Sequence, residues 1–257
     1  MKKLEASLLS LLFVLTACDG ETSGTPARPP DRSESASREP RSVPPACPNQ
    51  NEVAADDGRQ IGGELTGDVD GDDQADRVRL TLDAEAEVGC QAFLAVDLGA
   101  SSVVAPIWET GPQGGLPQPR LHSLVQVDSE GGLEILVDEV AGASTQFVAV
   151  YIYDDGSIEK IEPRGVPDGL FAYGGSVGHI EATGCASGGD IVVSQALPGE
   201  TRRSLNRSLY DVTRRYFTRV GEAYTRERVE RQRDVPLKNL DRFDEFGSGP
   251  FGNCPSR

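Results

Sequence analysis

The residues with the clearest chemical potential are acidic side chains repeated within one short stretch. Counting from Asp68 as position 1, carboxylates fall at positions 1, 3, 5 and 9, in Asp68, Asp70, Asp72 and Asp76, and Gln74 at position 7 offers its backbone carbonyl. Ca²⁺ takes about six to eight oxygen ligands, and alternate residues of a tightly curled loop can all point inward. Without a cation, these carboxylates would repel one another. We therefore predict a structural calcium site on these five residues, the alternative being an acidic turn without metal.

The residues around this loop indicate a strand and not a pair of helices. An EF-hand has Gly at position 6, Glu at position 12 and a helix on each side. Those positions hold Asp73 and Arg79 here, and apolar and polar residues alternate from Val78 to Leu82. This alternation is typical of a half-buried strand. The loop is therefore predicted to lead directly into a β-strand.

The same segment resembles a known repeat. Gly67-Asp68, Gly71-Asp72 and Asp76 match the pattern GDxxGDGxxD of FG-GAP/VCBS repeats. The chain resembles integrin-like β-propeller proteins at this motif, and residues 64–225 are similar to exported actinobacterial VCBS-containing proteins, notably at 140–145 and 174–176. Asp73 replaces the usual Gly, and Asp tolerates a left-handed conformation better than most residues. The resemblance implies a β-repeat domain in which calcium is structural.

Two weaker copies of the motif follow at intervals of about sixty residues. In the first copy Asp128, Glu130 and Glu134 take the places of Asp70, Asp72 and Asp76; the second copy, 184–193, has almost no acid. Position 1 of the first copy is Gln126, so we do not predict a second ion there. The predicted fold is all-β, a propeller-like or compact domain of about three degenerate repeats, near residues 67–125, 126–183 and 184–233 with a tail at 234–257. Three units are fewer than the roughly four to eight blades of closed propellers.

Short β-rich segments separated by Gly, Pro or Asp support the all-β class. Asp154-Asp155-Gly156-Ser157 is a hairpin signal. Residues 207–229 fit both strand alternation and, in places, a helix, and Gly221 near the middle favours a hairpin. The other predicted strands are Ala92–Val96, Val103–Trp108, Leu133–Glu139, Gln146–Tyr153, Ser157–Ile161 and Ile191–Ala196.

The start of the chain has the layout of a signal peptide, with Lys2 and Lys3 before an apolar run from Leu8 to Leu15. The run is shorter than the roughly 20 apolar residues that span a membrane. Leu15-Thr16-Ala17-Cys18 resembles the lipobox of bacterial lipoproteins, which implies a diacylated Cys18 as the mature N-terminus; two acyl chains give stable anchoring. The alternative is an ordinary secretory signal. We expect a signal peptide at 1–17, the lipidated Cys and a disordered tether at 18–46, and a domain at 47–257 on the extracytoplasmic face of the cell membrane.

The remaining cysteines are even in number, which in an exported chain predicts two disulfides with three possible pairings. They contain no CxxC pair, so a zinc site is poorly supported. One hypothesis is a bridge between the two ends of the domain, Cys47 and Cys254. The disulfide candidates are Cys47, Cys90, Cys185 and Cys254.

The formal net charge of -16 argues against a nucleic-acid partner. Ten arginines nevertheless crowd one late segment. They could meet anionic lipid headgroups or wall polymers, but we favour the interpretation that they face the domain's own acidic groups or solvent. They are Arg202, Arg203, Arg207, Arg214, Arg215, Arg219, Arg226, Arg228, Arg231 and Arg233.

No catalytic set emerges from the sequence. Gly174-Gly175-Ser176-Val177-Gly178 matches a GxSxG elbow beside His179, but no His follows and no helical pattern comes next, so a Gly-rich turn between strands is the better interpretation. His122 lacks a sequence partner. We predict a non-enzymatic envelope module that binds or scaffolds a protein or glycan. The alternatives are a carbohydrate-active hydrolase using two of the many carboxylates, and a purely structural envelope protein.

Overall fold

The structure, a computed structural model, describes most of the chain beyond the expected tether. The described residues are 47–48, 50–87, 89–99, 101–107, 118–128, 131–166, 169–176, 178–186, 188–199, 209–221 and 223–255. The predicted signal peptide, Cys18 and the predicted tether therefore lie outside them. Residues 45–257 belong to one compact unit. None of the helices in the described ranges has the length and apolar character needed to cross a membrane.

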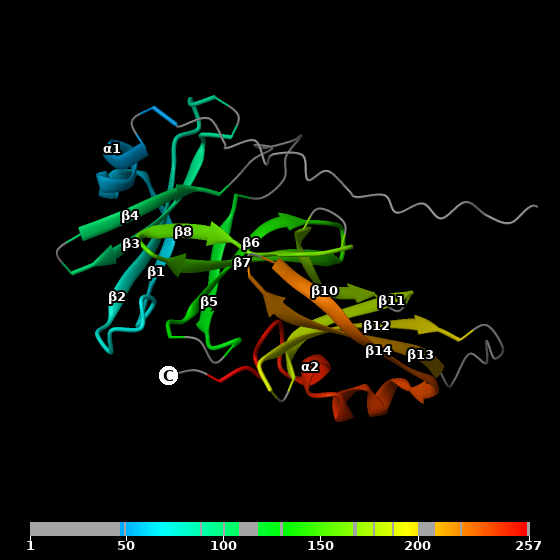
Figure 1. The fold of residues 1–257 in the computed structure, drawn as a ribbon. Helices are drawn as coiled ribbons and strands as arrows, with labels where there is room; N and C mark the ends of the chain where they lie inside the picture. Colours follow the sequence, from blue (N-terminus) through cyan, green and yellow to red (C-terminus); the bar gives the residue numbers. More distant parts are fainter. Residues whose placement is uncertain are drawn as a thin grey trace, which may run out of the picture. The chain divides into compact units, whose positions relative to one another are not determined.

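The first sheet is a four-stranded antiparallel meander (cyan to teal in Figure 1). Two short helices precede it, α1 (Gln50–Ala55) and η1 (Asp57–Arg59). The strand predicted after the Asp loop is confirmed, with Val78 and Leu80 fully buried, but it is not half-buried, because Arg79 and Thr81 on its other face are buried as well. The strands are β1 (Gln60–Gly67), β2 (Asp76–Leu82), β3 (Ala92–Leu98) and β4 (Ser101–Pro106).

The second sheet contains ten strands, and the long strand β7 is its branching point. β7 pairs with β6 on one edge, while its other edge pairs with β10 in the first half and β8 in the second. Strands make up most of the described elements, which supports the predicted all-β class. Over the described residues neither sheet closes into a ring. The strands are β5 (Arg120–Val125), β6 (Glu134–Ala141), β7 (Thr145–Asp154), β8 (Ser157–Lys160), β9 (Glu162–Pro163), β10 (Phe171–Ser176), β11 (His179–Ala186), β12 (Asp190–Pro198), β13 (Leu209–Val220) and β14 (Ala223–Pro236).

Two large apolar cores result from this arrangement, beside two smaller clusters around Tyr210 and around Phe93. The first lies between the first sheet and strands β6 and β7, and β1 lies beside β5 while β4 lies beside β8. The second core is built around Phe171, which meets Phe217, Tyr224 and Phe251 edge-on, with ring centroids 5.8 to 6.1 Å apart. Each such aromatic side chain stabilises the fold by about 1.5–3 kcal/mol through burial. Strands β6 and β7 contribute to both cores and therefore join the two halves.

Two disulfides are present, as the even cysteine count predicts, but the hypothesis of a bridge between the two ends is wrong. Cys47 pairs with Cys90, and Cys185 pairs with Cys254. Cys47 lies next to the connection between β2 and β3, and Cys254 lies next to β11, so each end is tied to its nearest core. The order of the cysteines along the chain does not show which of them lie close together in the folded protein.

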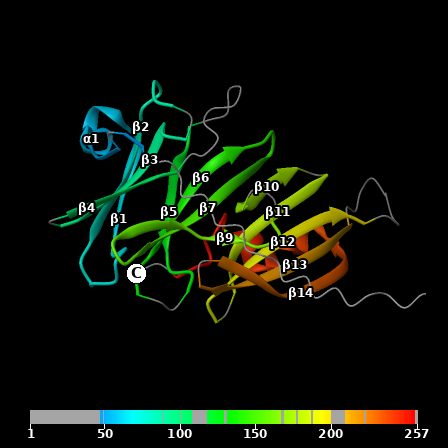
Figure 2. The same cartoon turned by 45° about the horizontal axis from the view of Figure 1, so that its top comes forward.

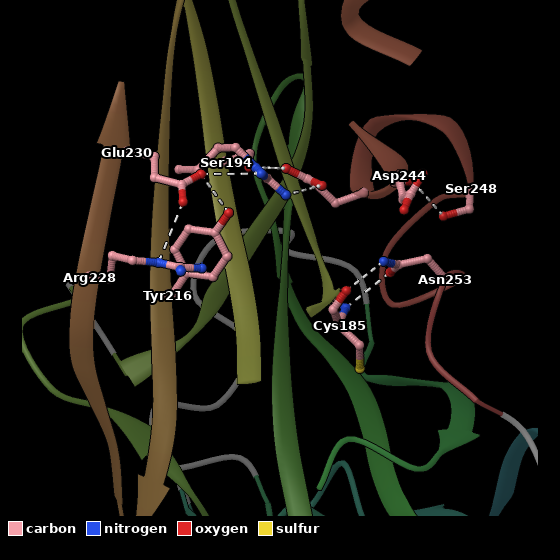
Figure 3. A network of polar contacts seen from close by, with 10 residues as sticks. Cys185, Ser194, Tyr216, Arg228, Glu230, Asp244, Ser248 and Asn253 are labelled. Atoms are coloured by element: carbon pink, nitrogen blue, oxygen red, sulfur yellow. Dashed lines mark hydrogen bonds and ion pairs between the residues drawn. The ribbon is translucent and has the colours of Figure 1, made fainter. Parts of the chain in front are cut away.

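The C-terminal segment, set apart by the sequence as a tail, is part of the fold. It contains η3 (Leu237–Arg242) and α2 (Asp244–Gly247). The buried Glu245 carboxylate accepts hydrogen bonds from Arg214 Nε (2.8 Å) and Nη2 (3.1 Å), and also from the Ser194 hydroxyl. The Asn253 side chain donates to the Cys185 carbonyl (2.6 Å) and accepts from its N–H (3.0 Å), as Figure 3 shows. These bonds fix the segment on strands β11 to β13.

Most strands predicted from the sequence are confirmed. At the β7–β8 turn, Asp155 and Gly156 have φ of 41° and 85°, as a two-residue hairpin turn of this type requires. Gly221, with φ of 61°, lies in the turn between β13 and β14. The hairpin predicted at Gly221 is therefore confirmed, and the helical alternative for this segment is wrong. Trp108, the last residue of one predicted strand, lies outside the described residues. Strands β1, β5, β9, β10 and β11 were not predicted, because their apolar residues are few or interrupted by Gly.

Candidate metal centre

The acidic loop connects β1 to β2 and has a closed base. Gly67 and Asp76 are paired across the two strands, so the chain leaves and re-enters the sheet at adjacent positions. The loop is braced from outside by the Leu133 N–H, which donates to the Asp68 carbonyl (2.8 Å). Asp76 is the first residue of β2 and is only 3% exposed. The loop is therefore anchored on a buried carboxylate.

Three of the five predicted ligands converge. Carboxylate oxygens of Asp68, Asp70 and Asp76 lie within 4.8 Å of one another. Oxygens bound to one Ca²⁺ at about 2.3–2.6 Å cannot be farther apart than about 5.2 Å. The separation therefore fits a shared Ca²⁺, and hard carboxylate oxygens are the donors that this ion prefers.

The other two predicted ligands, Asp72 and Gln74, are exposed and bonded to each other. The Gln74 backbone N–H and side-chain amide each donate to an Asp72 oxygen, both at 2.7 Å. The side chain of Asp72 is therefore engaged within the loop and is not one of the three converging carboxylates.

Backbone N–H groups hold the converging carboxylates in place. Asp68 accepts from the N–H of Gly71 (2.7 Å) and of Asp73 (3.1 Å), and Asp76 accepts from the Val69 N–H (2.8 Å). Asp73, which replaces the usual Gly, adopts the left-handed conformation, with φ of 65°, which Asp tolerates better than most residues. A carboxylate has about four lone-pair sites, so these bonds leave room for a cation.

Electrostatics within the loop disfavour the ionised form of the Asp70 carboxyl group. Loss of hydration raises the pKa of Asp70, opposed by the hydrogen bond from the Asp72 N–H, and the neighbouring carboxylates of Asp76, Asp72 and Asp68 raise it further. Like charges at short range favour the protonated form. A bound cation would reverse this effect, because it favours the ionised carboxylate.

The second loop, between β5 and β6, shares one hydrogen bond with the first among the residues that the structure describes. Glu134 accepts from the Val127 N–H (2.7 Å), as Asp76 does from Val69, and is 2% exposed. Burial, followed by the charge of Asp128, raises the pKa of Glu134 to about 7, although bonds from backbone N–H groups oppose the shift. Gln126, at the position of Asp68, donates its amide to the carbonyl of Asp128 (2.8 Å). Glu130 lies outside the described residues.

The two loops touch through their backbones. A Cβ on Gly132 would lie 1.8 Å from the Val69 carbonyl oxygen, so only glycine fits there. Arg219 from β13 reaches the second loop and pairs with Asp128 at 3.1 Å. A cavity of about 190 Å³ lies where these segments meet, lined by Val69, Asp70, Gly131, Gly132, Leu133, Glu134, Ile152, Tyr153, Asp154 and Arg219. The sequence gives no signal for this contact, because the segments are far apart in the chain.

The GxSxG match falls on a hairpin between strands, as expected. Ser176 at the end of β10 is paired with His179 at the start of β11. His179 Nε2 lies 2.9 Å from the Thr145 hydroxyl, and the Ser176 hydroxyl accepts from the Gly178 N–H (3.3 Å). The segment therefore lacks the strand-to-helix turn of a nucleophile elbow.

His122 has a partner that its sequence position did not reveal. Its Nδ1 lies 3.5 Å from Asp138, whose carboxylate also accepts from Arg120 (2.9 Å) and from the Tyr173 hydroxyl (2.8 Å). Loss of hydration opposes ionisation of Asp138, but the hydrogen bonds from these three residues outweigh it and lower its pKa. The cluster joins strands β5, β6 and β10 through a single ionised carboxylate.

Several arginines of the late segment pair with acidic groups of the domain. Besides the Arg214–Glu245 and Arg219–Asp128 pairs, Arg228 lies 3.5 Å from Glu230. Arg202, Arg203 and Arg207 lie outside the described residues. Of these three pairs only Arg228–Glu230 is exposed on both sides, and exposed pairs contribute little stability, typically less than about 1 kcal/mol.

No protein-family model matches this sequence, and comparisons with curated proteins and with solved structures likewise give no match.

Proposed function

We propose that this chain is a membrane-anchored extracytoplasmic lipoprotein whose β-domain carries a structural Ca²⁺ in the Asp68 loop. The convergence of the Asp68, Asp70 and Asp76 carboxylates within 4.8 Å is the observation that carries this proposal. When bound, Ca²⁺ would neutralise the mutual repulsion of these groups. The protein supplies a rigid frame, because backbone N–H groups already hold Asp68 and Asp76.

The domain is proposed to consist of three degenerate FG-GAP/VCBS-like repeats. Three successive meanders support this division: β1 to β4, β5 to β8 and β11 to β14. The strand after each motif copy is β2, β6 and β12, in the same place in each meander. The first two copies also share the bond from Val69 or Val127 to the acid at the start of the next strand. In the third, Asp190 accepts from the Thr218 hydroxyl (2.6 Å) instead.

The proposed role is that of a binding or scaffold module for an envelope protein or glycan, not of an enzyme. One cavity lies between the loop from β1 to β2 (the Asp68 loop), the loop from β5 to β6 (the Gln126 loop) and the end of β7. An ion in the Asp68 loop would therefore stiffen one wall of that cavity. Ordering a loop before a ligand arrives reduces the entropy lost on binding.

A calcium titration followed by thermal unfolding tests the metal. We expect stabilisation at roughly millimolar calcium that is absent in Asp70→Ala and retained in the control Glu85→Ala, which removes an exposed acid outside the loop. Identical melting of the unsubstituted protein in calcium and in chelator would refute the metal site.

Metabolic labelling with a palmitate analogue tests the anchor. We expect incorporation into the membrane-bound protein and loss of both label and membrane association in Cys18→Ser. Retention of the label in Cys18→Ser would show that lipid is attached elsewhere or not through a lipobox.

A further inference from the structure

Strand β14 forms a long edge of the second sheet. It pairs with β13 along its length, but on its other side it pairs with β9 only at Ala223 and Tyr224. Every residue from 226 to 234 is exposed. Figure 2 shows β14 as the outermost strand on this side of the sheet. Such an edge presents unpaired backbone N–H and C=O groups to any strand that can align with it.

This edge is held in a defined shape. The Tyr216 hydroxyl donates to Glu230 (2.8 Å), and the Arg228 guanidinium lies 3.8 Å from the centre of the Tyr216 ring (Figure 3). Arg214 joins the same group through Glu230 (3.4 Å) and is fixed by the buried Glu245. The strand is thus ordered before any partner arrives.

We propose that β14 pairs antiparallel with β14 of a second copy of this chain, about a two-fold axis at Val229. In that register Arg228 of each copy lies opposite Glu230 of the other, and Glu227 lies opposite Arg231. Each charged residue within two positions of the axis therefore faces an opposite charge. Val229, a large apolar side chain that is 37% exposed, faces its own copy. Opposite charges directly across a strand pair stabilise a sheet and like charges destabilise it.

The charge pattern selects this register over its neighbours. Moving the axis one residue toward the N-terminus places Arg228 opposite its own copy. Moving it one residue toward the C-terminus places Glu230 opposite its own copy. Both shifts bring like charges together at the centre of the interface. Charges on an edge strand usually prevent pairing, and of these three symmetric registers only the one centred on Val229 places no like charges opposite each other.

Two of the four charges have no competing partner among the described residues. Within the described part of the chain, no ion pair joins Glu227 or Arg231 to another residue. Both side chains are therefore available to a second copy. The proposal depends on neither calcium nor the lipid anchor.

Disulfide trapping tests the register in the full-length chain within membranes of expressing cells. In an antiparallel pair, residues on the two-fold axis have Cα atoms about 4.5–5.5 Å apart, within the roughly 4.4–6.8 Å range of disulfides. We expect Val229→Cys to form a covalent dimer under mild oxidation. Arg226→Cys is the control, because Arg226 would face Gln232 and lie about 20 Å from its own copy. Absence of the Val229→Cys dimer, or equal trapping by both variants, would overturn the proposal.

Reversing the charges of Glu227 and Arg231 provides a second test of the register, and it leaves the core residues unchanged. In the Val229→Cys background, Glu227→Arg and Arg231→Glu should each reduce trapping at least tenfold, because each creates two like-charge contacts. The double variant Glu227→Arg/Arg231→Glu should restore trapping, since the pairs are then reversed but complementary. Failure of the double variant to restore trapping, with its melting temperature unchanged, would contradict the proposed register.

Discussion

The Asp68 loop and the Gln126 loop share one hydrogen bond at their ends, and their described residues differ in what balances the acidic groups. Each precedes a strand that begins with a buried acid, and in each the acid accepts a backbone N–H seven residues earlier. In the Gln126 loop the other described acid, Asp128, is paired with Arg219, and the Gln126 amide donates to loop carbonyls. In the Asp68 loop three carboxylates converge instead.

This difference shows how one loop geometry can be completed in two ways. A side-chain amide at position 1 supplies N–H donors, so the second loop is closed by groups of the protein itself. A carboxylate at position 1 supplies only acceptors, so the first loop concentrates negative charge. We infer that the first loop uses a cation for the task that Gln126 and Arg219 perform in the second.

The largest effect is expected where the loops touch. Gly132→Ala would place a Cβ against the Val69 carbonyl, whereas a Cβ on Gly131 would have only the Gly71 Cα, at 4.0 Å, within reach. We expect Gly132→Ala to lower the free energy of unfolding by about 3 kcal/mol or more and Gly131→Ala to change it little. Chemical denaturation measures both. Equal stability of the two variants would show that the loops do not depend on each other.

The next largest effect is the pH dependence of stability that the buried carboxyl group of Glu134 produces. Because the pKa of Glu134 in the folded protein is raised to about 7, protonated Glu134 stabilises the fold. This contribution is fully present below its unfolded pKa near 4.5 and is lost as pH rises through about 7. Between pH 4 and 8 the free energy of unfolding should therefore fall by a value on the order of 2–3 kcal/mol, and this fall should be absent in Glu134→Gln. The comparison of urea unfolding curves across this range tests it, and an unchanged pH profile would contradict it.

A smaller effect is expected from making the second loop resemble the first. Gln126→Asp removes the amide donors to the carbonyls of Asp128 and Gly132 and adds a carboxylate. We expect a loss of about 1–2 kcal/mol in chelator, partly recovered in calcium. If calcium recovers none of the loss, position 1 alone does not decide whether the loop binds an ion.

The smallest effect concerns Asp72, whose oxygens are bonded to Gln74 and not to the converging group. Asp72→Asn should keep most of the calcium-dependent rise in melting temperature, while Asp76→Asn should abolish it. Calorimetric scans with calcium and with chelator compare the two. An equal loss of response in both variants would place Asp72 among the ligands.

Local patterns in the sequence determined the elements of this protein. Alternation from Val78 to Leu82 specified a strand, and Gly156 and Gly221 marked two hairpins, because these signals depend on neighbours only a few residues apart. The Asp loop was also visible as a motif. Its exact ligand set was not, since the same spacing allows Asp72 either to point toward the group or to bond Gln74.

Only the tertiary structure decided how distant segments meet. The pairing of Cys47 with Cys90, the fit of Gly132 against Val69, and the placement of Glu245 beneath Arg214 each join residues far apart in the chain. Such contacts are selected by the packing of whole strands and by the need to satisfy buried polar groups. The residues involved carry no local mark of their partners, so the sequence alone specified the parts, and packing of the two sheets chose among the ways to join them.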